Sequence, residues 1–143
     1  MNTANITADK FLKDITSDNP DYCKNLALFE IADIEILIQS ANNFSEISCY
    51  PYNPIFSKVT QPNLLGECIL WTIEGIKQNT RFPSLEPHLI NQETNGRLSM
   101  LELEEVYTLY ARWWKSYKDN PVPGLLNVDV LEPNNFRWNH VRF

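Results

Sequence analysis

The chain has 143 residues, of which 43% are hydrophobic and 21% are charged, a balance that is ordinary for a globular domain. This length predicts a single domain over residues 1–143 with one hydrophobic core. The net charge of −6 argues against a nucleic-acid partner, which would require clustered Lys and Arg. No apolar run approaches the roughly 18 residues that cross a bilayer, so we expect no integral membrane segment.

Helix-start signals mark the beginning of the chain. Thr7 is a suitable N-cap for a short helix over residues 8–15. A second helix is expected to open at Asn19-Pro20, because proline suits the first helical position.

The next segment, residues 28–41, carries both an alternating and a helical pattern of apolar side chains. Its length favours a helix from about Ala32. Residues 42–61 follow and include Tyr50-Pro51-Tyr52-Asn53-Pro54, whose prolines exclude a helix interior. We expect an ordered aromatic loop there.

Residues 62–78 predict a central helix that is covered by its neighbours. Apolar side chains follow the three-and-four spacing of a helix and extend around most of its surface. Glu67, Trp71 and Glu74 fall on one line along it, so two carboxylates flank an indole. The helix is expected to begin at Pro62 and to end near Asn79.

An irregular stretch, residues 79–98, precedes the clearest helix, which is predicted over residues 100–118. Ser99 and Glu102 have the spacing of a capping box at its start. The tail, residues 121–143, contains three prolines, and its closing segment, residues 136–143, predicts a short strand or a strap over the core. The expected fold is therefore mostly α, a compact single-domain helical bundle with long proline-rich loops.

Catalytic chemistry finds little support in the sequence. The four glycines form no phosphate-binding loop, and the two histidines and three cysteines lack the spacing of a metal site, so we expect no cofactor, no metal and no catalytic residue. Glu67 and Glu74, roughly 10 Å apart along a helix, have the separation of the carboxylates of an inverting glycosidase. The favoured alternative is that each pairs with a cation or a loop amide.

Acidic and aromatic side chains are better candidates for recognition. Residues 1–50 hold eight acids against three lysines, which would attract a basic protein. Trp113 and Trp114 are adjacent and point about 100° apart, so one of them could reach the surface unless loops cover it. Aromatic residues of this kind are frequent at the centre of protein interfaces. The predicted partner-binding residues are Glu30, Asp33, Glu35, Glu46, Tyr50, Tyr52, Phe56 and Trp114.

Three segments carry a resemblance to a known family: residues 32–38, residues 47–57 with the phrase Asn53-Pro54-Ile55, and residues 65–77 with Leu70-Trp71-Thr72-Ile73-Glu74. Together they resemble a domain-of-unknown-function family of small Bacteroidetes envelope proteins, often lipoproteins, over about residues 30–90. The resemblance implies a periplasmic or envelope-associated location if a leader has been removed, and the location is cytoplasmic otherwise. It implies no catalytic residues.

The first functional hypothesis is a non-enzymatic binding protein, an immunity protein that neutralises an antibacterial toxin with a basic surface through direct contact. An envelope accessory or structural protein is the second hypothesis. A small hydrolase that uses Glu67 and Glu74 is the third.

Overall fold

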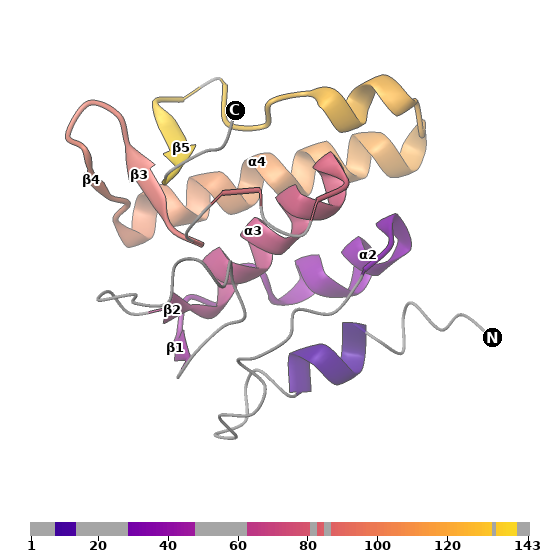
Figure 1. Cartoon of the computed structure of the whole chain (residues 1–143), viewed down its shortest axis with the longest axis horizontal. Coiled ribbons are helices and arrows are strands. Elements are labelled where there is room, and N and C mark those ends of the chain that lie inside the picture. The colour runs from indigo at the N-terminus through magenta and orange to yellow at the C-terminus, as the bar shows by residue number, and fades with distance from the viewer. Residues whose placement is uncertain are drawn as a thin grey trace.

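A computed structural model describes residues 8–13, 29–47, 63–80, 83–84, 87–132 and 134–139. Two helices dominate it: α3 (Leu65–Gln78) lies at the centre, and the longer α4 (Met100–Asp119) packs beside it (Figure 1). Residues 8–13 are also helical. Between residue 13 and α3, η2 (Ile31–Asp33), α2 (Ile34–Leu37) and η3 (Ile38–Ser40) form consecutive helical turns, of which α2 and η3 contact α3.

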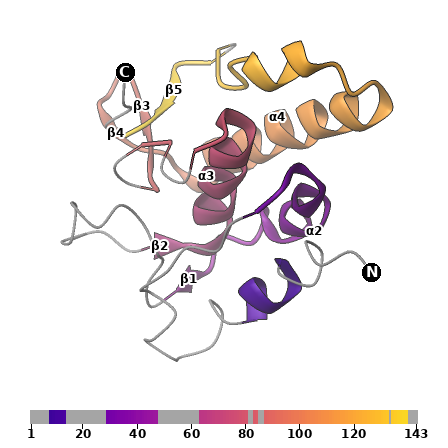
Figure 2. The ribbon, with the colours of Figure 1, turned by 45° about the vertical axis from the view of Figure 1, so that its right-hand side comes forward.

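In the described part of the chain, five short strands form two antiparallel sheets. β1 (Glu46–Ile47) pairs with β2 (Asn63–Leu64) immediately before α3. The second sheet has the order β4-β3-β5, formed by β4 (Gly96–Arg97), β3 (Leu89–Asn91) and β5 (Phe136–Trp138). Between α4 and β5, the chain passes through η4 (Pro123–Asn127) and runs back along α4 to reach this sheet (Figure 2).

The expectation of a mostly α helical bundle is wrong, because the chain combines helices with two small sheets. β3 and β4 lie in residues 79–98, which the sequence predicted to be irregular, and β2 occupies positions assigned to the start of a helix. Each strand has only two or three residues. An alternating pattern needs about four residues to be visible, so β1 to β4 leave no such signal in the sequence. β5 falls within residues 136–143, for which the sequence predicts a short strand or a strap.

The prediction for α3 is confirmed in its burial and in its end. All of its residues except Ile76 and Gln78 are buried. It begins later than expected, at Leu65, because the chain enters it from β2. Asn79 ends it in a left-handed conformation (φ 58°), while the amide of Thr80 donates to the carbonyl of Gly75 at 2.9 Å.

A close approach of two backbones fixes the start of α3. The amide of Gly66 donates to the carbonyl of Asn43 at 2.7 Å. A Cβ atom at Gly66 would lie 2.4 Å from the carbonyl oxygen of Ala41 and 2.8 Å from the ring of Phe44. Only glycine fits this contact, which locks α3 to the turn that follows η3.

The prediction for α4 is confirmed at both ends to within one residue. The amide of Glu102 donates to Ser99 Oγ at 3.2 Å, and the amide of Ser99 donates to Glu102 Oε1 at 2.9 Å, which completes the capping box. Asn91 of β3 donates to the other oxygen of Glu102 at 2.9 Å, so the helix start is also tied to the sheet.

Candidate functional site

Glu67, on α3, is held in the core by groups from two strands. Its side chain is 1% exposed. One oxygen, Oε1, accepts from Arg97 Nη2 at 2.7 Å and lies 3.3 Å from His88 Nδ1, while Oε2 accepts from the amide of Leu89 at 2.8 Å. The carboxylate therefore joins α3 to β3 and β4.

His88 completes this cluster. Its Nδ1 lies 3.1 Å from Arg97 Nη2, which can only donate, and 3.3 Å from Glu67 Oε1, which as a carboxylate oxygen accepts. Nε2 is buried and has no hydrogen-bond partner within the described residues. The ring is thus part of the core and has no contact with the pocket described below.

Glu74, two turns further along α3, belongs to a separate network. Its Oε1 accepts from the hydroxyl of Tyr110 at 2.6 Å, and Oε2 accepts from Lys77 at 3.3 Å and from Gln78. Trp138 of β5 donates to the Tyr110 oxygen at 3.1 Å. Burial raises the pKa of Tyr110 well above its ordinary value, and the neighbouring Glu74 charge raises it further.

These two networks do not support the hydrolase hypothesis. A pair of catalytic carboxylates must face one cleft with room for the substrate between them. Glu74 lines a pocket, whereas Glu67 is enclosed and does not line it. Each carboxylate is instead paired with its own cation, which is the favoured alternative stated above for both residues.

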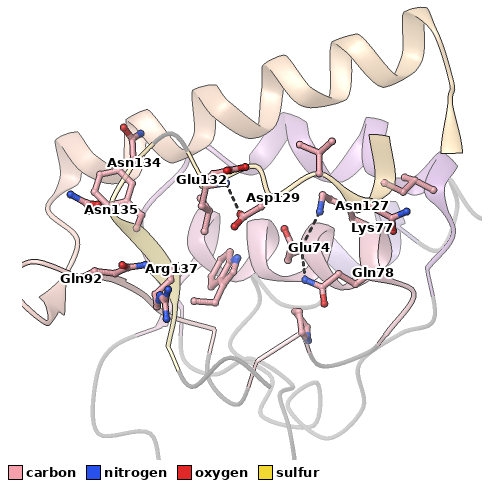
Figure 3. Close-up of a pocket in the computed structure, with 16 residues that line it drawn as sticks. Glu74, Lys77, Gln78, Gln92, Asn127, Asp129, Glu132, Asn134, Asn135 and Arg137 are labelled. Atoms are coloured by element: carbon pink, nitrogen blue, oxygen red, sulfur yellow. Dashed lines mark hydrogen bonds and ion pairs between the residues drawn. The ribbon is translucent and has the colours of Figure 1, made fainter. Parts of the chain in front are cut away.

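A pocket of about 700 Å³ opens beside the end of α3, against the returning segment between η4 and β5 (Figure 3). Gln92 and Arg137 lie at one end of it, Lys77 and Gln78 at the other, and Glu132 lies between them. The full lining consists of Glu74, Lys77, Gln78, Pro83, Gln92, Leu126, Asn127, Val128, Asp129, Leu131, Glu132, Asn134, Asn135, Phe136, Arg137 and Trp138.

Some of the charged side chains that line this pocket have a partner within the protein, and others have none among the described residues. Lys77 is only 3% exposed and is paired with Glu74. With its carboxamide oxygen toward the guanidinium, Gln92 accepts from Arg137 Nη2 at 2.9 Å. The carboxylate of Asp129 accepts from the amide of Leu131 at 3.0 Å, and within the described part of the chain neither it nor the carboxylate of Glu132 pairs with a lysine or arginine. Two exposed carboxylates therefore face the pocket without a countercharge.

The predicted partner-binding residues have different environments. Glu30 and Glu46 are exposed, as expected. Asp33 is fully buried, and its burial raises the pKa of the carboxyl. Tyr50, Tyr52 and Phe56 lie outside the described residues. The described acids that could meet a partner are thus fewer than the sequence indicated.

Glu35 and Trp114 bind each other. The indole of Trp114 is 7% exposed and donates to Glu35, whose carboxylate also lies 3.0 Å from Lys118. The hydrogen bond from Trp114, with that from Lys118, lowers the pKa of Glu35. Trp113 is also buried and donates to the carbonyl of Leu125 at 2.8 Å. Trp114 is thus bound by α2 and Trp113 by η4, and Trp114 has little surface to offer a partner.

Metal and thiol chemistry also lack a site in the described residues. No group of three or more His, Cys, Asp and Glu side chains there could hold a metal ion. Cys68 is fully buried, and desolvation raises the pKa of its thiol well above the ordinary value. A buried neutral thiol is a poor nucleophile, so Cys68 acts as a small core residue.

The model of a family described as a domain of unknown function, DUF4943, matches residues 2–139. The chain belongs to this family. No curated protein and no solved structure matches the chain. Within the described residues of this DUF4943 member, no helix is long and apolar enough to span a bilayer.

The pocket is the feature that sequence reasoning missed. Much of its wall comes from residues 126–129, 131–132 and 134–138, a tail for which the sequence predicted only a closing strand or strap over the core. A cluster of polar turn residues, Asn134-Asn135 with Glu132, was the available signal. That signal indicates a loop, but it does not say which helix the loop will face.

Proposed function

We propose that this protein is a non-enzymatic binding protein that recognises a basic protein partner by direct contact. The observation that carries the proposal is that the side chains suited to catalysis are buried or bound to other side chains of the protein. Glu67, His88 and Arg97 bind one another, Glu74 is bound by Tyr110 and Lys77, and Cys68 is a buried thiol. The exposed acidic groups are left for recognition.

Charge supports a basic partner. The chain carries 18 acids against 12 lysines and arginines. Among the described residues, Glu30, Glu46 and Glu132 are exposed and have no cationic partner. Such a surface attracts a positively charged protein and accelerates its association, and the effect weakens as salt is added.

We propose the more specific role of an immunity protein, which neutralises an antibacterial toxin by covering its surface. The small size of the chain and the resemblance to small Bacteroidetes envelope proteins support this role and a location in the periplasm or at the envelope. Recognition by contact alone requires no catalytic group, which agrees with the use of the buried carboxylates in the core.

Co-purification with the product of a neighbouring toxin-like gene tests the proposal. We expect a complex whose affinity falls as salt is raised, and protection of cells that express the toxin. The double variant Glu30→Lys, Glu46→Lys should weaken binding. The control double variant Glu104→Lys, Glu105→Lys makes the same change in net charge on α4 and should weaken it less. If no toxin-like product binds or is neutralised, the proposal is wrong, and an envelope accessory role takes its place.

A further inference from the structure

The pocket between α3 and residues 126–138 can be assigned a ligand from its lining. We propose that it binds a short peptide segment carrying a lysine or arginine side chain. This inference rests on the proposed function in one respect, because it takes the segment to belong to the protein partner. The chemistry of the pocket is argued independently below.

The size and shape of the pocket come first. Its volume of about 700 Å³ falls within the range of ligand pockets, roughly 300–1,000 Å³. Its walls belong to α3, β5 and the loops beside them, so its shape is fixed by regular structure on two sides. Trp138, one of the lining residues, is held by the hydrogen bond that its indole donates to Tyr110.

Carboxamides supply the contacts that a peptide backbone needs. Five asparagine and glutamine side chains line the pocket, and a carboxamide carries two N–H donors and an acceptor oxygen. A peptide group likewise carries one donor and one acceptor. These side chains are Gln78, Gln92, Asn127, Asn134 and Asn135. Within the protein, Gln78 already donates to Glu74, Asn135 donates to Glu93, and Gln92 accepts from Arg137.

Asp129 and Glu132 select a cationic side chain. They lie between the two ends of the pocket, and their carboxylates have no lysine or arginine partner within the described residues (Figure 3). Of the two cations in the lining, Lys77 pairs with Glu74, and Arg137 lies at one end of the pocket against the neutral carboxamide of Gln92. The three carboxylates of the lining therefore outnumber its two cations. Nearby apolar groups of Leu126 and Val128 can contact the aliphatic stem of a lysine or arginine.

Titration of the full chain with acetyl-Gly-Lys-Gly-amide, followed by backbone NMR, tests the assignment. We expect chemical-shift changes confined to residues of the pocket lining. We also expect the lysine peptide to bind more tightly than its norleucine analogue, which keeps the four-carbon side chain and lacks the ammonium group. Asp129→Asn with Glu132→Gln should weaken binding of the lysine peptide about fivefold and leave the norleucine peptide unchanged. Asparagine at position 129 keeps an acceptor for the Leu131 amide.

Matched controls make the outcome decisive. Glu104→Gln with Glu105→Gln removes the same charge from exposed positions of α4 and should leave the affinity unchanged. Equal binding of the lysine and norleucine peptides overturns the proposal, as does an absence of binding by both. Binding of a neutral trisaccharide such as maltotriose with no peptide binding also overturns it, because it would assign the pocket to sugars.

Failure here can be distinguished from failure of the proposed function. If a toxin partner binds and the Asp129→Asn, Glu132→Gln variant binds it equally well, the pocket assignment is wrong and the proposed function stands. If the lysine peptide binds as expected but no toxin partner exists, the pocket assignment stands and the immunity role is wrong.

Discussion

The hydroxyl of Tyr110 on α4 donates a hydrogen bond to the buried carboxylate of Glu74 on α3, with 2.6 Å between the two oxygens. The same hydroxyl accepts from Trp138 of β5 at 3.1 Å. One phenol therefore connects both long helices and the last strand. Because its pKa is raised well above the ordinary value of 10.0, it remains a donor at alkaline pH where a free tyrosine would ionise.

Replacement of Tyr110 by phenylalanine should destabilise the fold by about 1–3 kcal/mol, because Glu74 loses a donor and Trp138 loses an acceptor in the core. Urea denaturation measures the change. Tyr107→Phe, at a half-buried position of the same helix, is the control and should stay within about 0.5 kcal/mol. A similar loss in both variants would contradict the role assigned to the phenol.

Replacement of Glu67 by glutamine should cost about 3 kcal/mol, because it removes the charged partner of Arg97 in the interior. Arg97 is itself 23% exposed, which keeps the loss at the lower end of the range for buried pairs. Thermal or urea unfolding checks it against Glu105→Gln, an exposed position on α4. An unchanged unfolding midpoint for Glu67→Gln would show that the cluster contributes nothing to stability.

Replacement of Gly66 by alanine should destabilise the protein by about 2 kcal/mol, because the new methyl group would meet the Ala41 carbonyl at 2.4 Å. Gly124 is a matched control, since a Cβ added there meets nothing within 4 Å. Denaturation of the two variants under identical conditions gives the comparison. Equal stability of Gly66→Ala and the parent would mean that the turn moves away without cost.

The pKa of Glu35 should rise toward its ordinary value of 4.5 when Trp114 is replaced by phenylalanine, because the hydrogen bond that lowers it most is removed. Carboxyl NMR titration measures this shift. A carboxyl with a lowered folded-state pKa contributes stability above its unfolded pKa and loses it as the pH falls. The variant should therefore lose less stability than the parent on acidification below about pH 4.5, and Lys115→Ala should leave the Glu35 titration unchanged.

Local signals predicted the helices well and the strands poorly. The capping box of Ser99 and Glu102 and the apolar spacing after it define α4, because each of these contacts lies within four residues in sequence. β5 falls within the residues predicted as a short strand or a strap, but neither it nor β3 is long enough to show that Leu89 will pair with Trp138. Their pairing depends on contacts far apart in sequence.

The candidate site shows the same division. The sequence placed Glu67 and Glu74 on one line of a helix and favoured pairing for each, but it could not name the partners. Arg97 lies 30 residues from Glu67, and Tyr110 lies 36 residues from Glu74. Spacing along one helix carries no information about which strand or helix will face it. The partners of the two carboxylates and the lining of the pocket could therefore be identified only from the three-dimensional structure.

The order of the three-stranded sheet has a consequence for biosynthesis. β3 is the middle strand, and its second neighbour, β5, lies almost fifty residues later in the chain. When only the two long helices have emerged from the ribosome, one edge of β3 has no neighbouring strand and the hydroxyl oxygen of Tyr110 lacks its donor, Trp138. The nascent chain is therefore exposed to aggregation and chaperone capture until residue 138 emerges.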